Sequence, residues 1–271
     1  MADSTLSWSP IDWEDPCGGT IRLWPFIPNV VLTETLRRTT GEWDGLAFLL
    51  PDDESEIWDE QIKQEKSSPG INRDSIAASG GTLARMMLGM SVIASIQTCR
   101  FPDPEPRRLL IAAESSSGTG SRSVFFVEPE DEDWTEWVED CADEMVRLRN
   151  LARSIFSGKI WKNTLREAMK NASPPECERD DTKANGLAQA SAFGAAWWYR
   201  SESVLSEELC IRRDTRLASR LRGALGTLCG GQVDGEEAPV LLVTVMQAWM
   251  PSIYSALEKS PLPEHVEVEE K

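Results

Sequence analysis

A regular spacing of apolar residues in the middle of the chain most strongly constrains how these 271 residues can fold. The residues recur at intervals of four and three, and they are Trp134, Val138, Cys141, Met145, Leu148, Ala152 and Ile155. Such intervals place the side chains on one face of an α-helix. Acidic residues crowd its first half and basic residues its end, an arrangement that the helix dipole favours. The spacing therefore predicts an amphipathic helix over about 131–157.

Short apolar runs before this helix have the composition of β-strands. Residues 109–111 and 124–127 flank a stretch rich in serine and glycine, and residues 45–50 have a similar apolar composition. Apolar runs on either side of a flexible loop predict a β-hairpin, here over about 108–127. Three alternating prolines within 102–106 predict a stiff, extended connector that leads into this hairpin.

A polar, proline-containing segment, residues 172–182, is the best candidate for a linker. It separates an α+β region, residues 1–171, from a region over 183–260 whose small residues and spaced leucines predict packed helices. The charged tail, residues 261–271, is expected to be disordered. The predicted fold class is therefore α+β and predominantly helical, with a small N-terminal antiparallel sheet or hairpin and a helical C-terminal region.

The segment 238–257 contains no charged residue and is long enough to be considered as a membrane span. Pro239, Gln247 and Pro251 interrupt it, and no basic cluster flanks it. We therefore expect a buried core element instead: a strand, a helix, or a strand that leads into a helix.

Negative charge is concentrated in two places along the chain. The net charge is −17, and residues 52–60 and 128–144 carry six and ten acidic residues without a basic one. Such a surface repels nucleic acid backbones and anionic lipids. It either keeps the chain in solution or attracts a basic or amphipathic protein partner.

Several classes of chemistry lack their usual residues. The single histidine, His265, lies in the C-terminal tail, so histidine-assisted nucleophiles are disfavoured. The six cysteines are widely spaced, without a zinc-binding pattern, and indicate reduced thiols in the cytoplasm. The loop 118–123 lacks the lysine of a phosphate-binding motif. We therefore predict no catalytic residue, no metal site and no cofactor.

Four arginines lie on one side of the helix predicted over 211–228: Arg212, Arg213, Arg216 and Arg220. This face either recognises an anion, such as nucleic acid or an acidic partner, or pairs with the acidic residues of the chain itself. Direct nucleic acid binding is expected only through this face.

The acidic clusters and the eleven tryptophans together predict a non-enzymatic interaction subunit, or adaptor, of a larger cytoplasmic assembly. Its predicted partner-binding residues are Trp137, Glu136, Glu139, Asp140, Asp143, Trp8 and Trp13. One alternative is an enzyme that uses carboxylates, with or without a divalent metal. A second alternative is a nucleic-acid-linked accessory protein that uses the helix from Arg212 to Arg222, or an acidic mimic of nucleic acid.

Overall fold

The strands of the protein form one mixed sheet. The computed structural model describes residues 6–115, 122–150, 157–231 and 238–267, and the five strands within these ranges are ordered β1-β2-β5-β3-β4. They are β1 (Ile11–Glu14), β2 (Thr20–Phe26), β3 (Gly45–Phe48), β4 (Ser123–Phe126) and β5 (Val240–Met246). β1 is antiparallel to β2, whereas β2, β5, β3 and β4 run parallel.

Strand β5 lies at the centre of this sheet. It pairs with β2 on one side and with β3 on the other, and its residues 241–245 are all buried. A strand that is covered on both faces has a continuous apolar sequence, which explains the uncharged run in this part of the chain. The 183–260 region therefore supplies the central strand of a sheet whose other strands come from residues 1–171.

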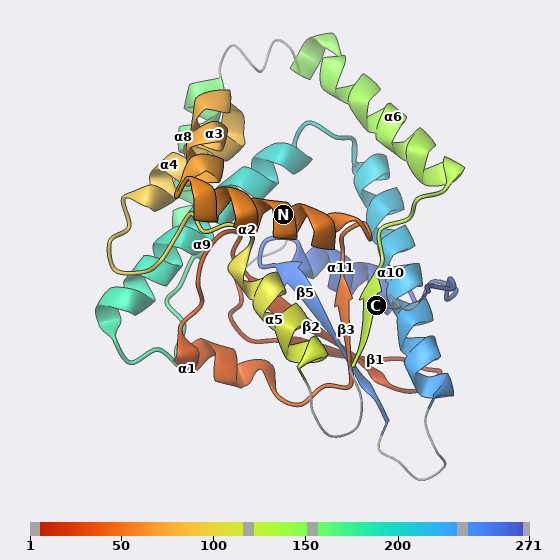
Figure 1. The fold of residues 1–271 in the computed structure, drawn as a ribbon. Coiled ribbons are helices and arrows are strands. Elements are labelled where there is room, and N and C mark those ends of the chain that lie inside the picture. The colour runs from red at the N-terminus through yellow and green to blue at the C-terminus, as the bar shows by residue number, and fades with distance from the viewer. Residues whose placement is uncertain (1–5, 116–121, 151–156, 232–237, 268–271) are drawn as a thin grey trace.

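Helices surround the sheet. They are α1 (Glu34–Arg37), the short 3-10 helix η1 (Arg38–Thr40), α2 (Glu54–Ser67), α3 (Ile71–Ser79), α4 (Gly81–Ser91), α5 (Pro104–Glu114), α6 (Glu132–Val146), α8 (Ser157–Asn171), α9 (Asp181–Glu202), α10 (Glu207–Gly230) and α11 (Met250–Glu258). α5 lies in front of the strands and packs on β3 and β4, whereas α10 runs beside them and contacts β2, β3 and β5 (Figure 1). One core cluster joins buried residues from Leu6 to Val266.

The predicted fold class is confirmed: the protein is α+β and mostly helical, and its antiparallel pair, β1 and β2, lies near the N-terminus. The segment 238–257 forms a strand that leads into a helix, β5 followed by α11. In the described part of the chain, no helix combines the length and the apolar character that crossing a membrane requires.

The hairpin predicted over 108–127 is wrong, because residues 109–111 belong to α5. Pro104 occupies the first position of that helix, where a missing N–H costs nothing, so the prolines begin a helix instead of an extended connector. A short apolar run does not distinguish a strand from a buried helical turn. Residues 123–126 do form a strand, β4, but it pairs in parallel with β3.

The long helix predicted over 131–157 is shorter in the structure. Asp131 caps its beginning, since its side chain accepts a hydrogen bond from the Trp134 amide. α6 ends at Val146, because Arg147 adopts an extended backbone with ψ of 141°. Residues 151–156 lie outside the described residues, and α8 begins at Ser157.

The tail predicted to be disordered is ordered as far as residue 267. Val266 is buried, and the amide of Glu264 donates to the Ser219 carbonyl of α10 at 3.0 Å. Gly223 allows this approach, since a Cβ at that position would lie 1.6 Å from the Glu264 carbonyl oxygen. Residues 268–271 lie outside the described residues.

Candidate functional site

Helix α6 is attached to α10 by two stacked tryptophans. The rings of Trp134 and Trp137 lie 4.5 Å apart at 25°, and the Trp137 indole N–H donates to the Leu209 carbonyl at 3.0 Å. Trp134 donates to the Glu128 carboxylate at 3.1 Å. Trp134 and Cys141 are buried on the inner side of the helix. The predicted contact residue Trp137 is thus partly used to hold α6 in place.

Two of the predicted acidic contact residues are already paired within the chain. Arg212 contacts the carboxylate of Asp140 at 3.1 Å and that of Glu136 at 3.9 Å. These pairs are partly exposed, so each contributes little to stability. They do, however, make this part of α6 less negatively charged. Glu139 and Asp143 are exposed on α6, and no ion pair of theirs is recorded among the described residues.

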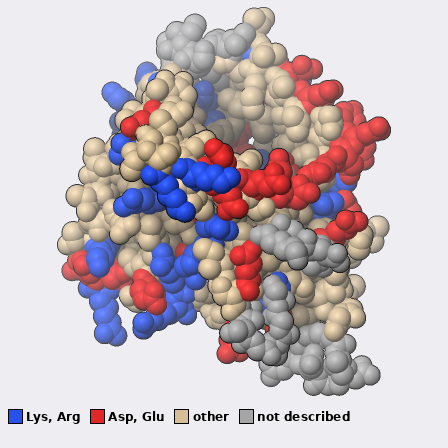
Figure 2. Space-filling view, viewed as in Figure 1, with Lys and Arg blue, Asp and Glu red and all other residues tan. Residues whose placement is uncertain are grey.

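Helix α6 and the residues just after it also carry exposed apolar side chains. Val138 is 48% exposed, Met145 52%, Val146 65%, and Leu148, just beyond the helix, 84%. Val138 and Met145 lie on the same stripe of the helix as Trp134 and Cys141, where the sequence predicted buried side chains, but they are exposed at the edge of that stripe. Val146 lies on the acidic side of the helix, three residues after Asp143. We call the four exposed apolar residues, with Glu139 and Asp143, the outer α6 surface. Figure 2 shows acidic side chains gathered along α6 and α2 on this face of the molecule.

The predicted contact residues Trp8 and Trp13 are buried. The Trp8 indole donates to the Ser173 carbonyl at 2.6 Å, and the Arg222 guanidinium lies over the Trp13 ring at 5.7 Å. The N-terminal segment therefore packs onto its own chain. These two rings belong to the core, and the structure does not present them on the surface.

The arginine face of α10 is occupied by carboxylates of the chain itself. Arg213 contacts Glu202 at 2.7 Å and Asp214 at 2.9 Å. Arg216 and Arg220 both bind the Glu264 carboxylate, at 2.7 and 3.0 Å, and Arg216 also contacts Asp131. The sequence left two roles open for this face: recognition of an external anion, or pairing with acidic residues of the same chain. The structure shows the second.

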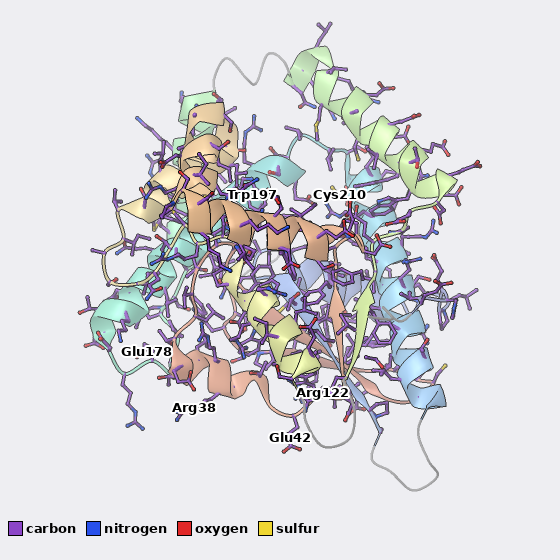
Figure 3. The ribbon with its side chains drawn as sticks, viewed as in Figure 1. Arg38, Glu42, Arg122, Glu178, Trp197 and Cys210 are labelled. Atoms are coloured by element: carbon purple, nitrogen blue, oxygen red, sulfur yellow. The ribbon has the colours of Figure 1, made fainter. Side chains whose placement is uncertain are left out.

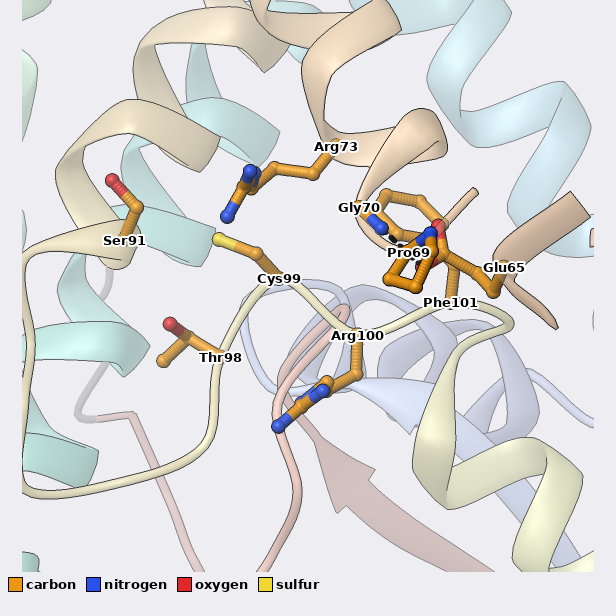
Figure 4. Close-up of a pocket in the computed structure, with 9 residues that line it drawn as sticks. All are labelled: Glu65, Pro69, Gly70, Arg73, Ser91, Thr98, Cys99, Arg100 and Phe101. Atoms are coloured by element: carbon orange, nitrogen blue, oxygen red, sulfur yellow. Dashed lines mark hydrogen bonds between the residues drawn. The ribbon is translucent and has the colours of Figure 1, made fainter. Parts of the chain in front are cut away.

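Five of the six cysteine thiols have a raised pKa, so none of these five is an activated nucleophile. Burial raises the pKa of Cys99, Cys141, Cys177, Cys210 and Cys229. For Cys210, labelled in Figure 3, burial and the Glu202 carboxylate raise the pKa to about 12. Cys99 lies beside Arg73 in a surface pocket near Glu65, and its thiol donates to the Met87 carbonyl at 3.3 Å (Figure 4). Thiols of this kind stay protonated at neutral pH.

The position of His265 in the fold is not evident from its position in the sequence. It is exposed at the mouth of a pocket of about 470 Å³ at the carboxyl ends of β3 and β4. Asp52, Glu128 and Glu130 line the same pocket, and the Asp52 carboxyl raises the pKa of Glu130. Within the described ranges, no three His, Cys, Asp or Glu side chains are grouped so that they could hold a metal ion.

Comparison with known proteins adds no relative from which a role could be transferred. Of the predicted contact residues, Glu139 and Asp143 are exposed and belong to the outer α6 surface. The exposed apolar residues of this surface were not predicted as contacts, because their spacing indicated a buried stripe. No family model matches the chain, and no curated protein or solved structure is detectably similar to it.

Proposed function

We propose that this protein is a non-enzymatic interaction subunit of a cytoplasmic assembly, and that it binds a basic, amphipathic segment of a partner protein on the outer α6 surface. The observation that carries the proposal is the exposure of Val138, Met145, Val146 and Leu148 within a short stretch of chain. Single exposed apolar residues are ordinary, but apolar residues gathered in one patch are typical of interaction sites.

The charge next to these residues defines the kind of partner. Glu139 and Asp143 are four residues apart, and Asp143 is the helical neighbour of Val146, three residues further along. Acidic groups beside an apolar stripe complement a helix that carries leucines on one side and lysines or arginines at its border. The free thiols of all six cysteines support a reducing compartment such as the cytoplasm.

The test is capture of the partner from native lysate with matched valine variants. Val146→Glu places a charge in the outer α6 surface, whereas Val92→Glu places the same charge at another exposed valine, at the end of α4. We expect a stoichiometric partner to be retained by Val92→Glu and weakened at least about tenfold by Val146→Glu.

Charge reversal at Glu139 and Asp143 should give the same loss and should make the remaining binding less sensitive to salt. The proposal fails if both valine variants retain the partner equally. It also fails if the protein remains monomeric and alone in its native lysate.

A further inference from the structure

A second site, separate from the outer α6 surface, lies at the carboxyl edge of the parallel strands. It is a pocket of about 320 Å³ between the ends of β2, β3 and β5 and the helices α2, α5 and α9. Its walls are mainly apolar, and five of the residues that line it are aromatic: Phe26, Trp58, Phe101, Trp197 and Trp249. Ligand sites in open parallel sheets lie at this edge, and this volume is in the range that holds a small molecule.

The aromatic walls are held in fixed positions by the surrounding residues. The Trp249 indole N–H donates to Asp214 at 2.9 Å, and its ring lies 4.8 Å from that of Trp198. Trp58 is almost completely buried and packs edge-on against Phe48 at 5.5 Å. Trp197, labelled in Figure 3, is half-buried and lines the pocket from α9. The pocket therefore presents preformed aromatic surfaces.

The polar group of greatest interest in the pocket is the carboxyl group of Asp103, which precedes the first turn of α5. One oxygen, Oδ2, accepts a hydrogen bond from the Asn29 amide at 3.2 Å. The other, Oδ1, is buried and has no hydrogen-bond partner in the protein. Buried oxygens of this kind are rare and are usually completed by a ligand or water. Glu54 adds a second carboxyl group to the lining.

The composition of the lining discriminates between classes of ligand. The residues that line this pocket, all within the described ranges, include two carboxyl groups and no Lys, Arg or His. An anion would find no positively charged side chain in this lining. A metal ion would have to give up bound water molecules, and the apolar walls offer no ligands to replace them. An organic ammonium ion gains from both features, because its charge is attracted to the faces of aromatic rings and to a carboxylate.

We infer that this pocket binds a small organic ammonium ion, with its charged head between the aromatic rings and Asp103. The charged head then lies next to Asp103 Oδ1, which has no hydrogen-bond partner in the protein alone. The apolar remainder of the ligand lies against Ile76, Leu83 and Met246.

The protonation of Asp103 gives this site a characteristic pH dependence. Burial raises the pKa of Asp103 to about 8; Glu105 on α5 and Glu54 on α2 act in the same direction, and the amides of Asn29 and Glu105 oppose them. Glu105 itself is paired with Arg108 and Arg37. The carboxyl group is therefore mostly neutral at pH 7, and a bound cation must displace its proton. Affinity should rise as the pH increases through about 8.

The test uses choline and its uncharged analogue, in which a tert-butyl group replaces the trimethylammonium group. Calorimetry or ligand-observed NMR should detect saturable choline binding at millimolar concentration and binding at least about tenfold weaker for the analogue. Asp103→Asn keeps the shape of the neutral side chain, so it should fold normally but lose both the choline affinity and its rise with pH. Trp197→Leu should weaken binding without removing the pH dependence.

Asp181→Asn, at an exposed aspartate in the first turn of α9, is the matched control and should bind choline as the parent does. Equal affinity for choline and its analogue would overturn the inference, since the pocket would then recognise shape alone. Unchanged choline binding by Asp103→Asn, or no saturable binding of choline by the folded parent protein, would overturn it as well.

Discussion

The buried ion pair between Arg222 and Asp15 shows how single residues hold the N-terminal segment to α10. Two hydrogen bonds, of 2.7 and 2.9 Å, join the guanidinium to the carboxylate, and both side chains are almost fully buried. Burial alone raises the pKa of Asp15, but hydrogen bonds from Arg222 and the Cys17 amide outweigh it and hold that pKa below its usual value. Removing one partner leaves an uncompensated buried charge.

We therefore expect Arg222→Met to lower the free energy of unfolding by about 3 kcal/mol or more at neutral pH. Arg38→Met removes a matched but exposed pair with Glu34 and should cost less than about 1 kcal/mol. Urea unfolding of the two variants measures the difference. Equal losses would show that the Arg222 pair does not hold the segment in place.

Residues whose roles depend on distant partners could not be assigned from the sequence. Trp8 is buried because it meets Ser173, and Asp103 becomes a pocket residue because the loop at Asn29 folds onto it. His265 reaches the ends of β3 and β4 because the tail binds α10. No local pattern records such contacts. Helix-capping residues differ in this respect, because a cap such as Asp131 acts on the first turn of its own helix.

At the scale of elements, two glycines of α10 should respond in opposite ways to the same substitution. A Cβ on Gly223 would collide with the backbone of Glu264, whereas a Cβ on Gly226 would meet no atom within 4 Å. Gly226→Ala should therefore stabilise the protein by about 0.5–1 kcal/mol through helix propensity. Gly223→Ala should displace the tail and expose residues 261–267 to protease. Limited proteolysis with thermal unfolding measures both, and equal behaviour of the two variants would contradict the packing described.

The ionic contacts of the tail should make its contribution to stability dependent on pH. Burial raises the pKa of Glu264, but hydrogen bonds from Arg216 and Arg220 outweigh it and hold the pKa below the usual 4.5. A carboxyl group with a lowered pKa stabilises the fold above its usual pKa, and that stabilisation is lost as the pH falls through the lowered value.

Glu264→Gln should therefore unfold more readily than the parent at neutral pH, and the difference should shrink as the pH falls below about 4.5. Unfolding curves across this range provide the measurement. A difference that stays constant with pH would mean that the charge of Glu264 does not fasten the tail.

The helices were predicted accurately only where the signal lies within the segment itself. The beginning of α6 was predictable because its cap and its apolar spacing are local. Its end was not, since the apolar spacing continues past Arg147 while the backbone leaves the helix there. α5 was mistaken for a strand because its apolar run is short, and because the prolines that begin the helix were taken to form an extended connector.

At the scale of the whole molecule, the sheet makes the two regions on either side of residues 172–182 interdependent. Without β5, strands β2 and β3 lose their shared neighbour and a large part of the core. Residues 1–182 alone should therefore fail to fold, and adding residues 183–271 should restore structure. Circular dichroism and amide NMR of the fragments test this. Cooperative unfolding of the isolated fragment 1–182 would show that it is an independent domain.

The fold class could be predicted from the sequence, but the sheet topology could not. Strand-like runs near the N-terminus and helical spacing over most of the rest indicate a mostly helical α+β fold. The pairing of Thr20 with Val240 joins residues that are far apart in the chain, and nothing local specifies it. The amount of surface charge could likewise be predicted, because composition sets it. The ion pairs between acidic residues and the arginines of α10 could not, because the fold sets them.

The most direct test of the proposed interaction role is methyl NMR of Val138, Met145, Val146 and Leu148 during titration with a basic amphipathic helical peptide. We expect saturable shifts confined to these methyl groups, weaker in high salt and absent for an acidic peptide with the same apolar residues. Shifts that spread elsewhere while these four remain unchanged, or equal binding of the acidic peptide, would contradict the assignment of the outer α6 surface as the site for a basic partner.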